Sequence, residues 1–170
     1  MSGITIRPEQ FRDADHVRTV NQRAFDGPDE AAIVDAVRAA PDAISLVAAD
    51  GDRVVGHILF TPVRIEGSTS AIRAAGLAPM AVLPEYQRRG IGSRLVNAGL
   101  DACRASGYDI VVVVGHPEYY PRFGFVPGST KGLECEYPVP ANVFMVVELR
   151  SGSLDGVRGL VRYLPEFAEH

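Results

Sequence analysis

The chain has 170 residues, of which 46% are hydrophobic and 22% are charged, a composition that suits one compact domain with a substantial core. Its formal net charge of -4 argues against a general nucleic-acid binder, which would carry a basic excess. No apolar run approaches the roughly 20 residues of a membrane helix, and the N-terminal segment lacks the apolar core of a signal peptide. We therefore expect a single cytoplasmic domain over 1–170, with no nucleic-acid or membrane partner.

The first third of the chain predicts one strand, two helices and a β-hairpin. Alternating apolar residues indicate the strand, and the hairpin turns at an Asp-Gly-Asp sequence. Apolar residues recur at roughly helical intervals through the first helix, as Phe11, Val17, Val20 and Phe25. The predicted bounds are 4–8 for the strand, 9–25 and 27–40 for the helices, and 44–49 and 54–65 for the hairpin strands.

The middle of the chain predicts a strand, a helix and a second strand. The first strand begins near Ala71 and ends at Val82, and it contains Pro79, which has no N–H to donate to a regular ladder. The amphipathic helix over about 90–106 ends at a glycine, and the continuous apolar run in the "YDIVVVVG" segment that follows is typical of a strand covered on both faces. We expect the two strands to be parallel, joined by a right-handed crossover, and splayed apart where the first one bends.

The last third predicts a brief helical turn and a short strand in "HPEYYPRFGF", then a proline- and glycine-rich loop and a late strand in "NVFMVVELR". The tail "GVRGLVRYLPEF" predicts a further strand or a packing segment. Together the elements predict a mixed α/β (α+β) fold, with a twisted mixed sheet flanked by helices. The two cysteines, Cys103 and Cys135, lack the spacing of a metal site, so we expect two reduced thiols and no metal.

The segment "QRRGIGSRL", residues 87–95, places a pair of arginines and two glycines where the predicted helix begins. Amides in the first turn of a helix have no intrahelical partner, so they suit phosphate oxygens, and glycine allows a phosphate to come close. Arg88 and Arg89 add positive charge, and Ser93 adds a hydroxyl. An ordinary helix start with surface arginines is the alternative. Walker-type and dinucleotide-binding glycine motifs are absent from the sequence.

Two motifs together resemble a known family. "QRRGIGSRL" after "MAVLPEY" resembles the Q/R-x-x-G-x-G/A motif of the GCN5-related N-acetyltransferase (GNAT) family, and "YYPRFGF" resembles its Tyr-x-x-x-Gly-Phe element. The segment "GHPEYYPRFGF" is most similar to that of a bacterial subgroup of small, uncharacterised acetyltransferases. The resemblance implies the acyl-CoA N-acyltransferase fold over about 4–149, followed by a C-terminal extension over about 150–170.

The resemblance also implies acetyl-CoA as co-substrate, bound where the two parallel strands splay apart. The amides from Arg88 to Ser93 would hold its pyrophosphate, and the main chain of Met80 to Val82 would pair with the pantetheine arm. The Val82 N–H would polarise the thioester carbonyl. The residues implied in cofactor binding are Met80, Ala81, Val82, Gln87, Arg88, Arg89, Gly90, Ile91, Gly92, Ser93 and Tyr120.

Three residues are candidates for catalysis. Tyr120 matches the tyrosine of the second motif, which by resemblance protonates the departing thiolate or contacts its sulfur. His116 stands where many family members carry asparagine, and it is either a proton relay or a capping residue. Glu30 is either a base or amine anchor, or an acidic residue that stabilises a helix start. The glutamate that the family often carries on its bent strand has no match between Ala71 and Val82.

The leading hypothesis is direct transfer of acetyl from acetyl-CoA to a primary amine of a small molecule or peptide, in a ternary complex. The missing glutamate motivates a second hypothesis, a non-catalytic acyl-CoA-binding regulatory or interaction module. A generic phosphate-binding protein is a third. The late strands leave an edge that would suit a homodimer.

Overall fold

The computed structural model describes residues 3–68 and 71–169 of the chain. The chain divides into two compact units. Unit 1 comprises Met1–Thr61, Ala78–Gly99 and Pro165–His170, and unit 2 comprises Pro62–Leu77 and Leu100–Leu164. Three elements contribute residues to both units: β3 (Arg53–Glu66), β4 (Ala74–Val82) and α3 (Ile91–Ala105).

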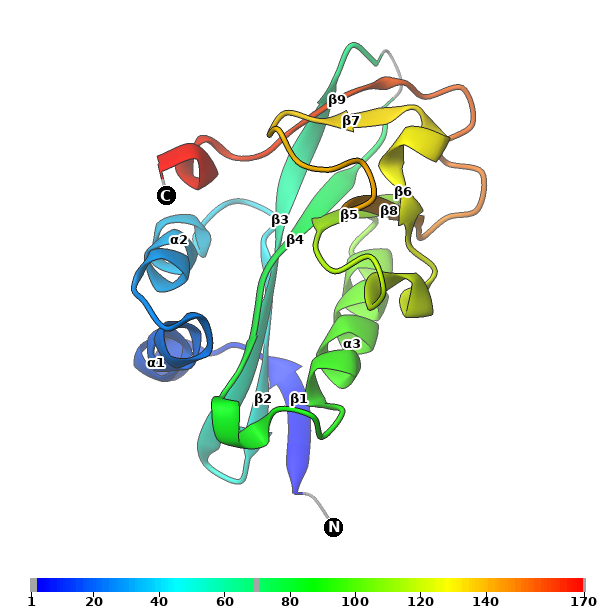
Figure 1. Cartoon of the computed structure of the whole chain (residues 1–170). Coiled ribbons are helices and arrows are strands. Elements are labelled where there is room, and N and C mark those ends of the chain that lie inside the picture. Colours follow the sequence, from blue (N-terminus) through cyan, green and yellow to red (C-terminus); the bar gives the residue numbers. More distant parts are fainter. Residues whose placement is uncertain (1–2, 69–70, 170) are drawn as a thin grey trace. The chain divides into compact units, whose positions relative to one another are not determined.

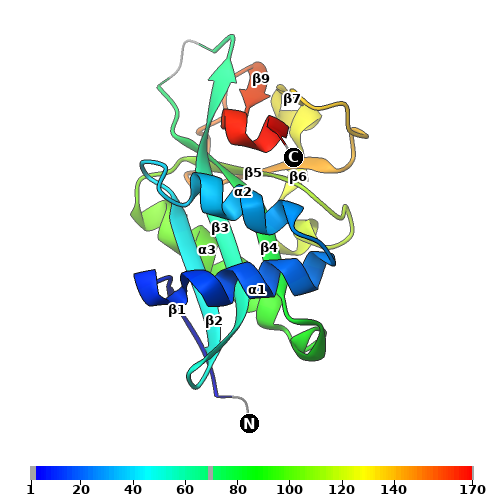
Figure 2. The ribbon, with the colours of Figure 1, turned by 90° about the vertical axis from the view of Figure 1, so that its left-hand side faces the viewer.

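Unit 1 is a sheet with the strand order β1-β2-β3-β4 and with helices on both faces. β1 pairs antiparallel with β2, and β2 pairs antiparallel with β3, with a shift in register at Ala48 and Ala49. α1 and α2 lie side by side across one face of these strands (Figure 2), and the start of α3 lies on the other face (Figure 1). The remaining elements of this unit are β1 (Ile4–Pro8), α1 (Ala14–Phe25), α2 (Asp29–Val37) and β2 (Ile44–Asp50).

Two glycines allow α3 to pack closely on β3. A Cβ atom at Gly99 of α3 would lie 2.2 Å from Cε1 of Phe60, and one at Gly56 of β3 would lie 3.1 Å from Cδ1 of Leu95. Phe60 and Leu95 are both fully buried. The absence of a side chain at each glycine therefore makes room for a large apolar side chain on the facing element.

The opposite face of β3 carries a buried polar chain. His57 is completely buried, with Nδ1 3.2 Å from the Asn21 amide nitrogen and Nε2 2.9 Å from Ser45 Oγ. Ser45 donates in turn to the Glu9 carboxylate, which pairs with Arg38 at 3.0 Å. These hydrogen bonds join α1, α2 and the first two strands to β3. His57 is therefore a structural core residue.

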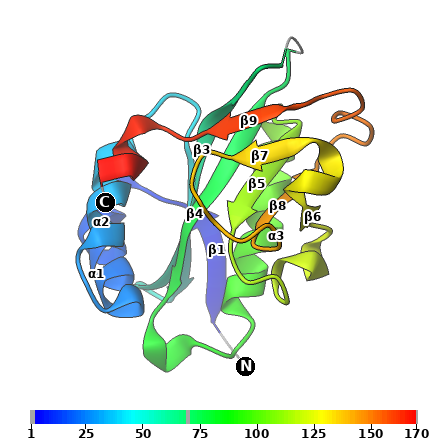
Figure 3. The ribbon, with the colours of Figure 1, turned by 45° about the horizontal axis from the view of Figure 1, so that its top comes forward.

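Unit 2 is built around β5 (Ile110–Val114), with the strand order β4-β5-β8-β6. β4 and β5 are parallel, as predicted, with Ala74 opposite Ile110, and β5 and β8 are antiparallel. A second ladder joins the end of β3 to β9 and β9 to β7, and Figure 3 shows β7 and β9 side by side. The further strands are β6 (Val126–Pro127), β7 (Leu133–Cys135), β8 (Phe144–Glu148) and β9 (Gly159–Arg162).

The predicted elements are present, with two differences. The first helix starts later than predicted, because a 3-10 turn over Phe11–Asp13 precedes α1. Asp13 fixes this turn by accepting hydrogen bonds at 2.7 Å from both Arg7 and the Gln10 N–H. Phe11 is therefore fully exposed, whereas Val17 of the same apolar pattern is buried.

The second difference lies in the C-terminal third. The proline- and glycine-rich loop contains a short strand that was not predicted, β7, which pairs in parallel with β9; the strand β9 is one of the two forms predicted for the tail. Within residues 3–68 and 71–169, no helix is long and apolar enough to cross a membrane.

Candidate functional site

The connection from β4 to α3 has a defined and unusual backbone. β4 ends at Val82, whose carbonyl accepts a hydrogen bond of 2.9 Å from the Gln87 side chain. Arg88 and Gly90 both have left-handed φ angles, of 65° and 80°. Glycine adopts this conformation without strain, but an arginine there is uncommon and often marks a functional turn. The Gln87 bridge and this turn bring the chain to the start of α3 at Ile91.

The start of α3 is suited to an anion. Its first amides have no intrahelical partner, and its first turn contains no acidic residue, unlike the first turn of α2, which contains Asp29 and Glu30. A Cβ atom at Gly90 would meet nothing within 4 Å, so the space beside the turn is open. Neither Arg88 nor Arg89 forms an ion pair with any carboxylate of the described residues, and both are exposed. Their charge is therefore available to a ligand.

The end of β4 forms the other predicted part of this site in unit 1. Pairing between β4 and β5 covers Ala74 to Leu77, and Pro79, which has no N–H, follows two residues later. The β4 strand then continues to Val82, with Ala81 and Val82 buried and Met80 half-buried. The structure thus brings Met80–Val82 and Gln87–Ser93 together at one end of unit 1.

His116 and Tyr120 lie together in one turn of unit 2. The carbonyl of His116 accepts hydrogen bonds from the N–H groups of Tyr119 at 3.1 Å and Tyr120 at 3.3 Å. The Tyr120 ring packs directly over Gly115, where a Cβ atom would lie 2.3 Å from the ring. Phe125 packs edge-on against the same ring, with the centroids 5.6 Å apart. The ring position of Tyr120 is therefore fixed by its own turn.

The environment of Tyr120 keeps its phenol protonated. The residue is 7% exposed, and burial, followed by the neighbouring Tyr119, raises the pKa of Tyr120 to about 12. His116 and Glu118 are exposed. Glu30 is half-buried in the first turn of α2, in unit 1, so the structure places it in the position of a helix-stabilising acid.

Neither cysteine resembles an activated nucleophile. Burial raises the pKa of the Cys103 thiol to about 12 and also raises the pKa of Cys135. Both thiols are free, as predicted. Among residues 3–68 and 71–169, no group of three or more potential ligands is placed to hold a metal ion.

Sequence reasoning missed a set of side chains beside the β4–α3 connection. Glu85 accepts hydrogen bonds from Arg23 at 2.8 Å and from Arg53 at 3.0 Å, and Tyr86 donates to Asp50 at 2.7 Å. The only sequence feature that indicates a role for Glu85 and Tyr86 at this connection is their position directly before the glycine motif. Their partners are more than 30 residues away in the sequence and carry no motif.

Comparisons with known proteins identify the family of the chain. The Acetyltransferase (GNAT) domain model matches residues 5–128. The uncharacterised N-acetyltransferase YjhQ of Escherichia coli strain K12 is 42% identical over 132 residues, which are 75% of this chain and 73% of YjhQ.

Two crystal structures are similar over almost the whole chain. The structure of the E. coli GNAT family N-acetyltransferase YhbS in complex with CoA has a TM-score of 0.92 and 34% identity, and the match covers 99% of this chain and 93% of YhbS. A GNAT family acetyltransferase from Brucella melitensis in complex with acetyl-CoA has a TM-score of 0.79 and 35% identity, with 98% and 99% covered. Because both the family model and these relatives span most of it, the chain belongs to the GNAT family of N-acetyltransferases.

Proposed function

We propose that this protein binds acetyl-CoA at the β4–α3 connection and transfers the acetyl group directly to a primary amine of a small molecule or peptide. The observation that carries the proposal is the left-handed turn at Arg88 and Gly90, which leads into a helix start with open space, no acidic residue in its first turn and two arginines that form no ion pair with a described residue. The CoA and acetyl-CoA complexes of the two similar structures support the choice of ligand.

The pyrophosphate would be held by the amides of Arg88 to Ser93, including those of Gly90, Ile91 and Gly92. The main chain of Met80 to Val82 would pair with the pantetheine arm, and the Val82 N–H would polarise the thioester carbonyl. The Gln87 side chain already donates to the Val82 carbonyl, so in this scheme it braces the connection that carries these groups.

In the reaction, the neutral amine nitrogen attacks the thioester carbon, the new C–N bond forms and the C–S bond breaks. Tyr120 would donate its phenolic proton to the departing thiolate, since burial keeps that phenol protonated. The nitrogen loses a second proton as the amide forms, and this proton balances the one that the phenol gives to the thiolate, so the phenol is restored through solvent. An alkylamine with a pKa near 10.4 must first lose a proton, which costs about 4 to 5 kcal/mol at pH 7 unless a group takes it up. His116 and Glu30 are the candidates for this uptake, directly or through water.

The first experiment is isothermal titration of the protein with acetyl-CoA, CoA and inorganic phosphate, repeated with Gly92→Trp. We expect micromolar binding of both CoA species, and loss of that binding when the indole fills the turn. Asn97→Trp is the matched control, because Asn97 is an exposed residue further along the same helix. Absence of CoA binding to the unaltered protein would overturn the proposal, and effective competition by inorganic phosphate would favour a generic phosphate-binding protein.

The second experiment separates an enzyme from a non-catalytic acyl-CoA-binding module, the alternative motivated by the absence of a carboxylate on β4. A panel of primary amines is screened for thiol release from acetyl-CoA, and Tyr120→Phe is measured with the best amine. For the proposed mechanism, we expect a large loss of turnover at nearly unchanged CoA affinity. CoA binding with no thiol release from any amine would support the binding module.

A further inference from the structure

Tyr86 lies three residues before Arg89 and forms a platform beneath it. The centre of the Arg89 guanidinium is 5.1 Å from the centroid of the Tyr86 ring, within the range of a cation–π contact. The ring is half-buried, and its hydroxyl donates a hydrogen bond of 2.7 Å to Asp50 at the end of β2. The Tyr86 ring is therefore held at two points, by its backbone and by its hydroxyl.

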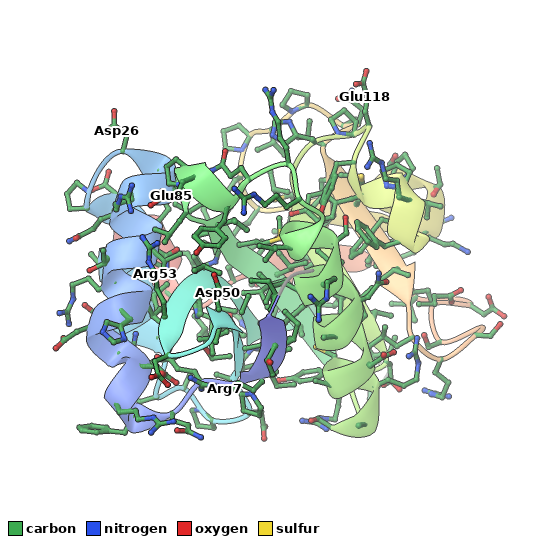
Figure 4. All side chains as sticks on the ribbon, turned by 90° about the horizontal axis from the view of Figure 1, so that it is seen from below. Arg7, Asp26, Asp50, Arg53, Glu85 and Glu118 are labelled. Carbon is green, nitrogen blue, oxygen red and sulfur yellow. The ribbon has the colours of Figure 1, made fainter. Side chains whose placement is uncertain are left out.

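A second arginine on the same ring provides a contrast. The guanidinium of Arg53 is 5.4 Å from the Tyr86 centroid, but Arg53 also donates to the Glu85 carboxylate at 3.0 Å. Figure 4 shows Asp50, Arg53 and Glu85 at the same end of unit 1. Arg53 thus shares the Glu85 carboxylate with Arg23, whereas Arg89 has no acidic partner among the described residues.

The geometry gives Arg88 and Arg89 different properties. Among the residues that the structure describes, Arg88 has neither an ion pair nor an aromatic contact, so nothing fixes its guanidinium. The contact with the Tyr86 ring restricts the position of the Arg89 guanidinium, and no described residue accepts a hydrogen bond from its N–H groups, which are the groups that recognise phosphate oxygens. A side chain that is ordered before binding loses less conformational entropy when the ligand arrives.

We propose that Tyr86 is a positioning residue, which holds Arg89 ready to bind a phosphate group of the cofactor. This inference rests on the proposed function, because it requires that acetyl-CoA bind at the β4–α3 connection. The phosphate is either in the pyrophosphate or on the 3′ carbon of the ribose. Both groups offer anionic phosphate oxygens to an arginine. A ligand that lacks one of the two groups is therefore needed to tell which of them Arg89 binds.

The test measures dissociation constants of CoA, 3′-dephospho-CoA and pantetheine by isothermal titration. We expect Arg89→Gln to weaken CoA binding about 10-fold and Tyr86→Leu to weaken it about 2- to 5-fold. Tyr86→Phe keeps the ring and is expected to stay within about 2-fold. The matched control is Arg53→Gln, which removes the ion-paired arginine from the same ring and is also expected to stay within about 2-fold.

Two results identify a positioning role. Tyr86→Leu should not weaken CoA binding further in the Arg89→Gln background, because the Tyr86 ring then has no arginine to position. Pantetheine, which carries no phosphate, should bind all variants equally. An effect of Arg89→Gln that disappears with 3′-dephospho-CoA assigns the 3′-phosphate, and an effect that persists assigns the pyrophosphate.

The inference is overturned if the two substitutions act additively, or if Tyr86→Leu weakens pantetheine as much as CoA, which would indicate a general structural role. Tyr86→Gln serves as a second ring-less variant if Tyr86→Leu does not fold. Failure of the proposed function gives a different result, since the unaltered protein would then bind no CoA at all.

Discussion

The buried His57 makes a quantitative prediction about stability at low pH. The amide nitrogen of Asn21 donates to the Val17 carbonyl at 3.0 Å and approaches His57 Nδ1 at 3.2 Å, so Nδ1 must accept. The proton therefore resides on Nε2 and is donated to Ser45 Oγ. A second proton on the ring would point at the Asn21 N–H group, so this site suits only the neutral imidazole.

Burial, followed by the nearby charge of Arg38, lowers the pKa of His57 to about 3. The Glu9 carboxylate, 3.9 Å from Nε2, would favour the charged ring, but Arg38 pairs with it and offsets this effect. In the unfolded chain a histidine has a pKa of about 6.5, so protonation favours the unfolded state. The stabilising effect of the neutral ring is complete above pH 6.5 and declines as the pH falls towards 3. Below about pH 6.5, each pH unit lowers the free energy of unfolding by about 1.4 kcal/mol. The loss between pH 7.5 and pH 5 is therefore about 2 kcal/mol, because only the part below pH 6.5 contributes.

The assay is urea unfolding at pH 7.5 and pH 5, with the unaltered protein and His57→Gln. Glutamine stays neutral over this range, so the variant should lose about 2 kcal/mol less between the two pH values. His16→Gln is the matched control, because it replaces an exposed histidine of α1 and leaves His57 in place, so this variant should keep the loss of stability that His57 causes. The reasoning is refuted if His57→Gln keeps the full pH response of the unaltered protein.

Two glycine substitutions test the close contacts. Gly115→Ala places a Cβ atom 2.3 Å from the Tyr120 ring, so we expect about 10-fold or more lower turnover with unchanged CoA affinity, measured with the amine selected by the thiol-release screen. Gly27→Ala is its control, because a Cβ there meets nothing closer than 4.0 Å; equal turnover of the two variants would contradict the prediction. Gly99→Ala should lower the free energy of unfolding by about 1 to 3 kcal/mol in urea titrations, because its Cβ would lie 2.2 Å from Phe60. Adding Phe60→Leu should restore part of this loss, and a further loss would argue against the contact.

The sequence was most informative where a local pattern coincided with burial. The continuous apolar run of β5 predicted a strand covered on both faces, and Ile110 to Val113 are all buried. Glycines predicted both ends of α3, and Gly90 and Gly107 both have left-handed φ angles. These features depend on neighbours within a few residues, and periodicity and turn chemistry report such neighbours directly.

Features that depend on distant partners were less predictable. The apolar pattern around α1 includes Phe11, which is fully exposed because the Arg7–Asp13 pair fixes a 3-10 turn before the helix begins. β7 was not predicted, because it is short and its ladder partner, β9, is distant in the sequence; a strand in the tail was one of the two predicted forms, and β9 is that strand. The candidate site also has a part that could be predicted and a part that could not. The motif residues were identified by resemblance, whereas the hydrogen bond of Tyr86 with Asp50 joins residues 36 positions apart and has no local signal in the sequence.

Net charge could not have revealed the proposed anion site. The chain is acidic overall, and what matters locally is which cations lack an acidic partner. Arg23 and Arg53 share the carboxylate of Glu85, and these pairs lower the pKa of Glu85 to about 2, so that it stays ionised at neutral pH. Arg88 and Arg89, a few residues further along, have no such partner among the described residues, and they lie next to the unpaired amides of α3. Glu85 therefore pairs with both neighbouring arginines and offsets part of their charge, whereas the two arginines of the glycine turn have no acidic partner among the described residues.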